Sequence, residues 1–158
     1  MSEIIKGSLQ SESFIVSGGD GDTGVLAKTG DIKAVDGNMT ITSATKGIVH
    51  TNSGTITQAT DHTNGVTINA TSGVIQLAAV ALNATTNAEF TVTNSTVQAD
   101  SVILITVQDE NTTDNKSMFA TIHTIAAGSF VINLANPNSS GNTSATASKI
   151  HFLVINNS

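Results

Sequence analysis

Apolar and polar residues alternate most regularly between Asn87 and Thr93. Ala88, Phe90 and Val92 are apolar, and the residues between them are polar. A period of two is typical of a β-strand with one buried face and one wet face. We therefore predict a half-buried strand in this segment.

Two other segments are apolar on both faces. Val102–Val107 opens with four consecutive apolar residues, and Ile150–Ile155 places Ile150, Phe152 and Val154 on one side and His151, Leu153 and Ile155 on the other. Antiparallel sheets commonly leave one face in water, so a strand with two apolar faces needs a cover beyond its own core. We predict that a neighbouring copy of the chain provides that cover.

From Thr55 onward, apolar segments recur at the spacing of about 8–12 residues that is typical of β-sandwiches. We predict that residues 51–158 form an all-β domain, an antiparallel, jelly-roll-like β-sandwich. Its predicted core contains Phe90, Val92, Leu104, Ile132, Phe152 and Val154. The predicted strands are Thr55–Gln58, Val66–Ile68, Val74–Leu77, Glu89–Thr93, Val102–Val107, Met118–Thr124, Ser129–Leu134 and Ile150–Ile155.

Turn residues separate these strands. Asn64-Gly65, Thr71–Gly73 and Ala126–Gly128 are typical of short turns, and Asn136–Ser148 is a long polar loop that contains the only proline. Leu77–Ala84 is the one segment with a helical composition, and its length allows two turns at most.

Residues 1–50 have a different pattern. Glycines interrupt short apolar pieces such as Phe14–Val16 and Ile32–Val35, and their irregular spacing does not match a solenoid repeat. We predict an extended, strand-rich N-terminal arm that binds a partner, for example by strand addition.

Composition excludes several function classes. Twelve carboxylates against six lysines give a net charge of −6, and the chain contains no arginine, so the basic cluster that nucleic-acid binding requires is missing. The absence of cysteine excludes disulfides and thiolate metal sites. The first residues lack the pattern of a signal peptide, and no apolar run reaches the ~20 residues of a membrane helix. We expect a soluble intracellular product with no membrane partner.

The histidines do not form a recognisable site. None of them has the H-x-H or H-x-x-x-H spacing of metal ligands. Asp61-His62 falls in a turn without a nucleophile motif, so we interpret it as a solvated turn, and we expect structural roles for the strand histidines. The four are His50, His62, His123 and His151.

Gly18–Gly24, with the sequence GGDGDTG, is similar to calcium-binding motifs in its glycines. Thr23 stands where the GGxGxD motif requires aspartate, no second repeat follows, and the EF-hand pattern lacks its closing glutamate. We interpret the segment as a flexible acidic turn. We therefore predict no catalytic, cofactor-binding or metal-binding residues, no cofactor and no enzymatic activity.

Four segments over roughly the last two thirds of the chain share a set of local features. The features are Thr57-Gln58 before a Gly-Val-Thr strand, Phe90-Thr91 with Thr93-Asn94, the Ala127–Phe130 turn and the closing Ile150–Ile155 strand. The segments are Thr42–Asn69, Ala88–Val107, Ile125–Leu134 and Lys149–Asn156. With these features they resemble a family of small β-rich virion proteins of tailed bacteriophages. The acidic loop Asp109–Lys116 departs from the family, which has a glycine-rich turn there.

The resemblance implies a structural protein of the virion, either of the capsid or of the tail. The leading hypothesis is a capsid decoration, or cement, protein on the capsid surface, with the major capsid protein as partner and a homotrimer as the favoured assembly. The alternative is a tail-fibre or receptor-binding subunit. A polysaccharide depolymerase ranks third, because it needs paired carboxylates and aromatic platforms, and the chain has no Trp or Tyr.

Overall fold

The computed structural model describes residues 48, 50–109, 118–143 and 145–157. The chain divides into two units, Met1–Gly47 and Ile48–Ser158, and the described strands belong to the second. Of the predicted arm, only Ile48 and His50 are among the described residues, and the acidic turn Gly18–Gly24 lies outside them.

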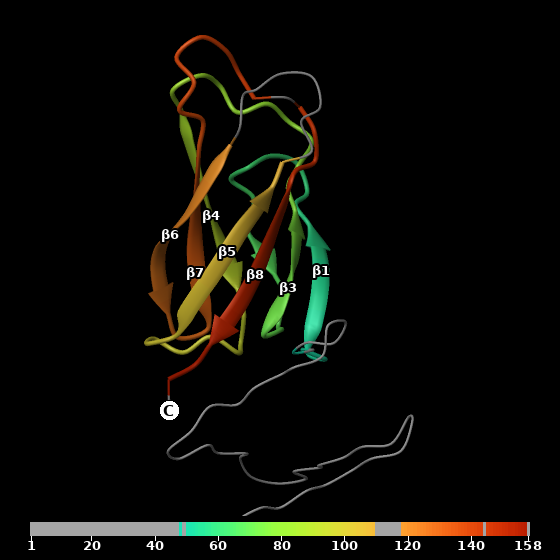
Figure 1. The fold of residues 1–158 in the computed structure, drawn as a ribbon, viewed down its shortest axis with the longest axis vertical. Helices are drawn as coiled ribbons and strands as arrows, with labels where there is room; N and C mark the ends of the chain where they lie inside the picture. The colour runs from blue at the N-terminus through green and yellow to red at the C-terminus, as the bar shows by residue number, and fades with distance from the viewer. Residues whose placement is uncertain (1–47, 49, 110–117, 144, 158) are drawn as a thin grey trace, which may run out of the picture. The chain divides into compact units, whose positions relative to one another are not determined.

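Within the described residues, eight strands form two four-stranded sheets (Figure 1). Sheet A has the order β1-β3-β8-β5, and sheet B has the order β2-β4-β7-β6. The described part of the chain is therefore all-β, and each predicted strand is present with bounds shifted by three residues or fewer. The strands are β1 (Ser53–Thr57), β2 (Val66–Thr67), β3 (Ser72–Gln76), β4 (Asn87–Thr93), β5 (Val102–Gln108), β6 (Phe119–Ala126), β7 (Ser129–Ala135) and β8 (Lys149–Ile155).

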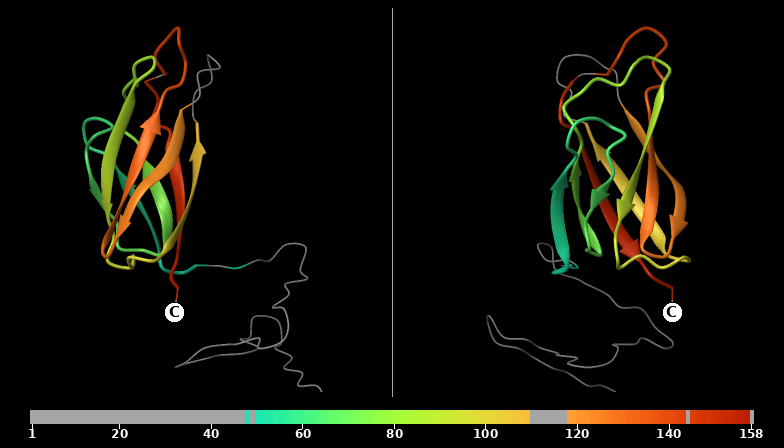
Figure 2. Two further views of the ribbon diagram at one scale, coloured as in Figure 1. Left: turned by 90° about the vertical axis from the view of Figure 1, so that its left-hand side faces the viewer. Right: turned by 180° about the vertical axis from the view of Figure 1, so that it is seen from behind.

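The core lies between the two sheets, which form separate layers in the views of Figure 2. Along β4 the exposed and buried residues alternate as predicted, with Ala88, Phe90 and Val92 buried. The rings of Phe130 on β7 and Phe152 on β8 have centroids 5.9 Å apart, so they join the layers directly. Besides Phe130, the large apolar side chains that are fully buried are Ile75, Leu77, Ile132, Leu134, Ile150 and Val92.

The sheets are mixed, whereas we predicted antiparallel ones. β1 pairs with β3 and β2 pairs with β4 in parallel, and the remaining pairs are antiparallel. The first four strands alternate between the sheets, so the chain coils around the core and returns to each sheet in its earlier direction. The alternation of apolar and polar residues predicts which face of a strand is buried, but it does not predict the relative direction of paired strands. This is why the antiparallel part of the prediction was wrong.

The prediction that Leu104 lies in the core was also wrong. β5 pairs with β8 in a register that sets Ile103 opposite Val154 and Ile105 opposite Phe152. These isoleucines face inward, and Leu104 is 51% exposed. Because Val102–Ile105 is apolar throughout, its sequence contains no alternation that could set the phase.

No described residue is helical, and Leu77–Ala84 is irregular. Neighbouring loops hold its backbone: the Ala78 N–H donates to Gln58 Oε1 at 3.3 Å, and the Leu82 N–H donates to Thr143 Oγ1 at 2.8 Å. Leu77, Ala78 and Leu82 are buried. These side chains close the end of the core without forming a helical turn.

Two glycine-containing turn predictions had different outcomes. Gly128 lies in the tight β6–β7 connection with a φ of 83°, a value that favours glycine. The prediction of a turn at Thr71–Gly73 was wrong at its end, because β3 begins at Ser72. Gly73 is a packing glycine within a strand.

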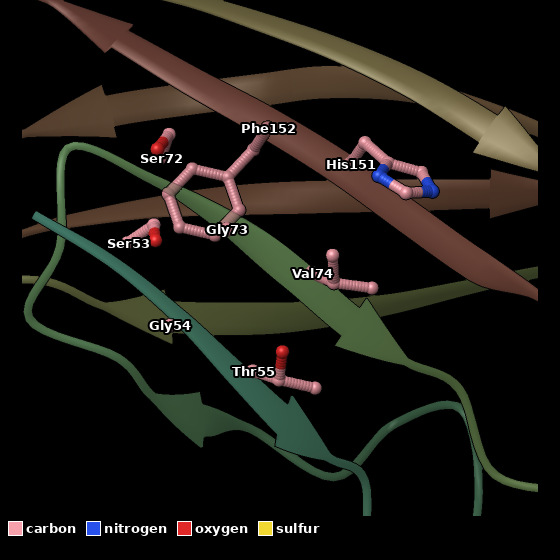
Figure 3. Close-up of a pocket in the computed structure, with 8 residues that line it drawn as sticks. All are labelled: Ser53, Gly54, Thr55, Ser72, Gly73, Val74, His151 and Phe152. Carbon is pink, nitrogen blue, oxygen red and sulfur yellow. The ribbon is translucent and has the colours of Figure 1, made fainter. Parts of the chain in front are cut away.

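Replacing Gly73 with alanine should destabilise the protein by about 1–3 kcal/mol, as over-packing of a core does. An added Cβ would lie 2.6 Å from the backbone oxygen of Gly54 and 2.9 Å from the Phe152 ring. Figure 3 shows this ring reaching from β8 to the position of Gly73. Gly54→Ala is the matched control, since its Cβ would contact only the flexible end of Ile68, at 3.3 Å. Equal midpoints in urea for the two variants would contradict this packing account.

Candidate protein-binding face

The outer face of sheet A carries an exposed apolar patch on its two last strands in sheet order, β5 and β8. Val102 is opposite Ile155, and Leu104 is opposite Leu153. Val102, Leu104 and Ile155 are 45%, 51% and 45% exposed, while Leu153 is half-buried. We call these four residues the apolar patch. The prediction of two-sided apolar strands is confirmed for β8 and for the first half of β5.

A shallow hollow lies beside the patch, over β1 and β3. Its volume is about 480 Å³, and its walls include Ser53, Thr55, Ser72, Val74 and His151. Thr55, Val74 and His151 follow one another across three strands, as Figure 3 shows. The hollow forms because small side chains occupy β1 and the start of β3.

A second hollow, of about 280 Å³, lies between β5 and β8. Leu104, Thr106 and Leu153 line it, and it shares His151 and Phe152 with the first hollow. His151 Nε2 lies 2.9 Å from Gln108 Oε1, which fixes the imidazole between the two hollows. The outer face of sheet A therefore has an apolar side on β5 and β8, where Leu104 and Leu153 line the second hollow, and a more polar side on β1 and β3.

The electrostatics of this face differ from those of the whole chain. The outward positions of its four strands contain Lys149 and His151 but no carboxylate, although the chain has a net charge of −6. Another acidic protein can approach such a face without repulsion between carboxylates.

The outer face of sheet B is more polar, although Phe119 at the start of β6 is 59% exposed. Glu89 Oε1 on β4 lies 2.9 Å from His123 Nδ1 on β6, across strand β7. His123 is the extra residue at an irregularity where the pairing shifts between Ile122 and Thr124. Both side chains are about half exposed, so this contact contributes at most about 1 kcal/mol. Threonines such as Thr91 and Thr121 surround the pair on the same face.

Asp61 and His62 separate in the structure. Asp61 is exposed, and its Oδ1 accepts hydrogen bonds from the Thr63 hydroxyl at 2.6 Å and the Thr63 N–H at 2.7 Å, which lower the pKa of the carboxyl. His62 is 3% exposed, so the interpretation as a solvated turn was wrong for this residue. Its Nε2–H donates to the Val80 carbonyl at 2.9 Å, and its Nδ1 has no hydrogen-bond partner among the described residues.

Because His62 is buried, the free energy of unfolding should decrease as the pH falls below about 6.5, the ordinary pKa of histidine. Burial lowers the pKa of His62, with the Val80 hydrogen bond and the Asp61 charge opposing it. Below pH 6.5 the imidazole therefore stays neutral in the native protein but takes up a proton in the unfolded protein. The contribution of His62 to the free energy of unfolding is complete above pH 6.5 and is lost as the pH falls towards the lower pKa of the native state. Urea titrations of wild-type, His62→Gln and exposed His50→Gln proteins measure this contribution. An unchanged pH dependence in His62→Gln would contradict it.

The four histidines are not brought together. His50 is exposed ahead of β1, His62 is buried in the β1–β2 connection, and His123 and His151 lie on the outer faces of different sheets. Among the described residues, no group of three or more His, Asp or Glu side chains could hold a metal ion. This part of the chain also contains no helix that is long and apolar enough to cross a membrane.

Buried amides are the polar residues that the sequence pattern did not reveal. Asn136 Nδ2 donates to the Leu82, Asn83 and Gly141 carbonyls at 2.9–3.1 Å, and its Oδ1 accepts from the Asn138 backbone N–H at 3.0 Å. Asn94 donates to the Ala70 carbonyl at 2.8 Å, and Gln58 donates to the Asn64 carbonyl at 2.9 Å. These residues hold loops together and do not form a site. Asparagine is so common in this sequence that its buried copies cannot be recognised from it.

Comparisons with family models, curated proteins and solved structures found no match for this chain.

Proposed function

We propose that this chain is a structural protein of a tailed-bacteriophage virion, and specifically a capsid decoration protein that binds the lattice of the major capsid protein. The observation that carries the proposal is the apolar patch on the outer face of sheet A. Exposed clusters of large apolar side chains are characteristic of protein-binding surfaces. In this account the protein functions by burying surface and performs no chemistry.

The fold supports the proposal in a general way. Double-sheet β domains with eight strands are common among virion proteins, and the jelly roll is one such architecture. We propose that the two sheets form a related β-sandwich with a modified strand order, since β1/β3 and β2/β4 pair in parallel. The N-terminal arm completes the proposed design by reaching the capsid lattice, while the domain forms a trimer.

Adding purified protein to particles that lack it tests the function. The wild-type protein should occupy many sites spread over the capsid, and deletion of residues 1–35 should leave a folded protein that no longer binds. Copies per particle are counted by quantitative gel analysis, and electron microscopy locates them. Thr121→Ala, on the polar outer face of sheet B, is the control variant.

The same measurement distinguishes the tail-fibre alternative. A few copies confined to the tail, with binding of the purified protein to host cells, would contradict capsid decoration and support a receptor-binding subunit.

A further inference from the structure

We propose that the connection between β1 and β2, residues 58–65, is a pH-sensitive switch: protonation of His62 releases the connection from the irregular segment Leu77–Ala84 while both sheets stay folded. The opening is local, so it differs from a loss of stability of the whole domain. It lies away from the apolar patch and does not depend on the proposed function.

The first argument is that one side chain anchors the tip of the connection, residues 59–64. All of these residues are described by the structure, and His62 is the only one among them that is buried. Its Nε2–H donates to the Val80 carbonyl at 2.9 Å, and this hydrogen bond joins the tip to the irregular segment. The tip should therefore stay in place only as long as the imidazole stays in its site.

The second argument is that the tip holds its own shape. Asn64 Oδ1 accepts hydrogen bonds from the backbone N–H groups of Thr60 and Asp61, both at 2.8 Å. Asp61 Oδ1 accepts from the Thr63 N–H and hydroxyl, and the Asn64 N–H donates to the Asp61 carbonyl at 3.3 Å. Because these bonds lie within the tip, an outward movement of the whole tip breaks none of them.

The third argument is the position of the added proton. Because Nε2 carries the hydrogen that the Val80 carbonyl accepts, a second proton binds to Nδ1. Nδ1 of His62 is buried and has no hydrogen-bond partner among the described residues. In the closed position, protonation therefore places a charge and an unpaired N–H in a buried site, and both are unfavourable. Movement of the ring into water removes both costs.

The surroundings of His62 compensate little for this charge. His62 lines a hollow of about 320 Å³ together with apolar residues that include Val80, Leu82 and Ala88. Among the described residues of this lining, Asp61 is the only other titratable one, and those from the irregular segment and from β4 are not titratable. The Asp61 charge raises the pKa of His62, but burial lowers it more, so the pKa lies below its ordinary value.

Amide hydrogen exchange, followed by NMR between about pH 7.5 and about pH 5, tests the proposal. The Ala78 N–H reports the opening, because it donates at 3.3 Å to Oε1 of Gln58, whose Nε2 donates to the Asn64 carbonyl of the tip. The Leu82 N–H is the matched control in the same irregular segment. It donates to Thr143 Oγ1 at 2.8 Å, so it is held by a different loop.

The protection of the Ala78 N–H, corrected for the intrinsic pH dependence of exchange, should fall below about pH 6.5, by up to about tenfold per pH unit. The protection of the Leu82 N–H should change much less. His62→Gln should abolish the fall, since a glutamine amide can donate to the Val80 carbonyl but does not titrate. The exposed control His50→Gln should leave the fall unchanged.

Three results would overturn the proposal. Protection that falls in parallel at Ala78 and Leu82 would show that protonation acts only through unfolding of the whole domain. Protection of Ala78 that does not depend on pH would show that the connection stays closed. A His62→Gln protein that still loses protection at Ala78 would assign the effect to another group. The comparison of the two amides in the wild-type protein decides the proposal even if His62→Gln does not fold.

Discussion

Replacing Phe152 with alanine should lower the free energy of unfolding by about 3–5 kcal/mol, the usual cost of removing a buried phenylalanine. Phe152 is 4% exposed, lies against Phe130 of the other sheet and fills the space that Gly73 leaves open. Because the surrounding strands are hydrogen-bonded on both sides of β8, they cannot collapse into the cavity.

Leu104→Ala is the matched control, because it removes a large apolar side chain from the exposed side of the neighbouring strand. It should change stability by less than about 1 kcal/mol. Urea unfolding followed by circular dichroism is the measurement, since the chain has no Trp or Tyr to report by fluorescence. The measurement uses dilute protein, so that self-association does not raise the measured free energy of unfolding. Similar losses in the two variants would contradict the observed orientation of β5.

Replacing Asn136 with alanine should cost about 2–3 kcal/mol, because buried groups that lose their partners pay the cost of desolvation. Its side chain is 1% exposed and donates to three carbonyls, of Leu82, Asn83 and Gly141, so a single substitution releases both loops that meet at this end of the core.

Asn69→Ala is the control for Asn136, since Asn69 is exposed and its Oδ1 accepts a hydrogen bond from the Ser95 N–H at 2.9 Å. We expect it to cost less than about 1 kcal/mol. Equal unfolding midpoints for the two asparagine variants would show that the buried network contributes little.

Strand positions could be predicted from the sequence because their patterns are local. The alternation around Phe90 sets both the strand and its buried face, and Asn94 follows the end of the strand. The phase of β5 could not be predicted from four consecutive apolar residues. It is set by pairing with β8, about fifty residues later in the chain.

The candidate face could also be predicted in part, because the apolar pattern of each strand is local in the sequence. Two-sided apolar strands indicated an exposed apolar surface, and β8 alternates so that Leu153 and Ile155 face outward. The hollow beside the patch could not be predicted, because it depends on the parallel pairing of β1 with β3. The burial of His62 depends on Val80, which lies in an irregular segment that joins other elements.

The central claim is that the outer face of sheet A becomes covered when the protein assembles, and thiol labelling tests it most directly. The chain contains no cysteine, so Leu104→Cys and Thr121→Cys each introduce a single thiol, the first in the patch and the second on the polar face of sheet B. We measure the rate of maleimide labelling in dilute solution, in concentrated solution and on decorated particles. The account predicts that the thiol at position 104 becomes protected on assembly while the thiol at position 121 keeps its rate. Equal and unchanged rates at both positions on decorated particles would contradict it.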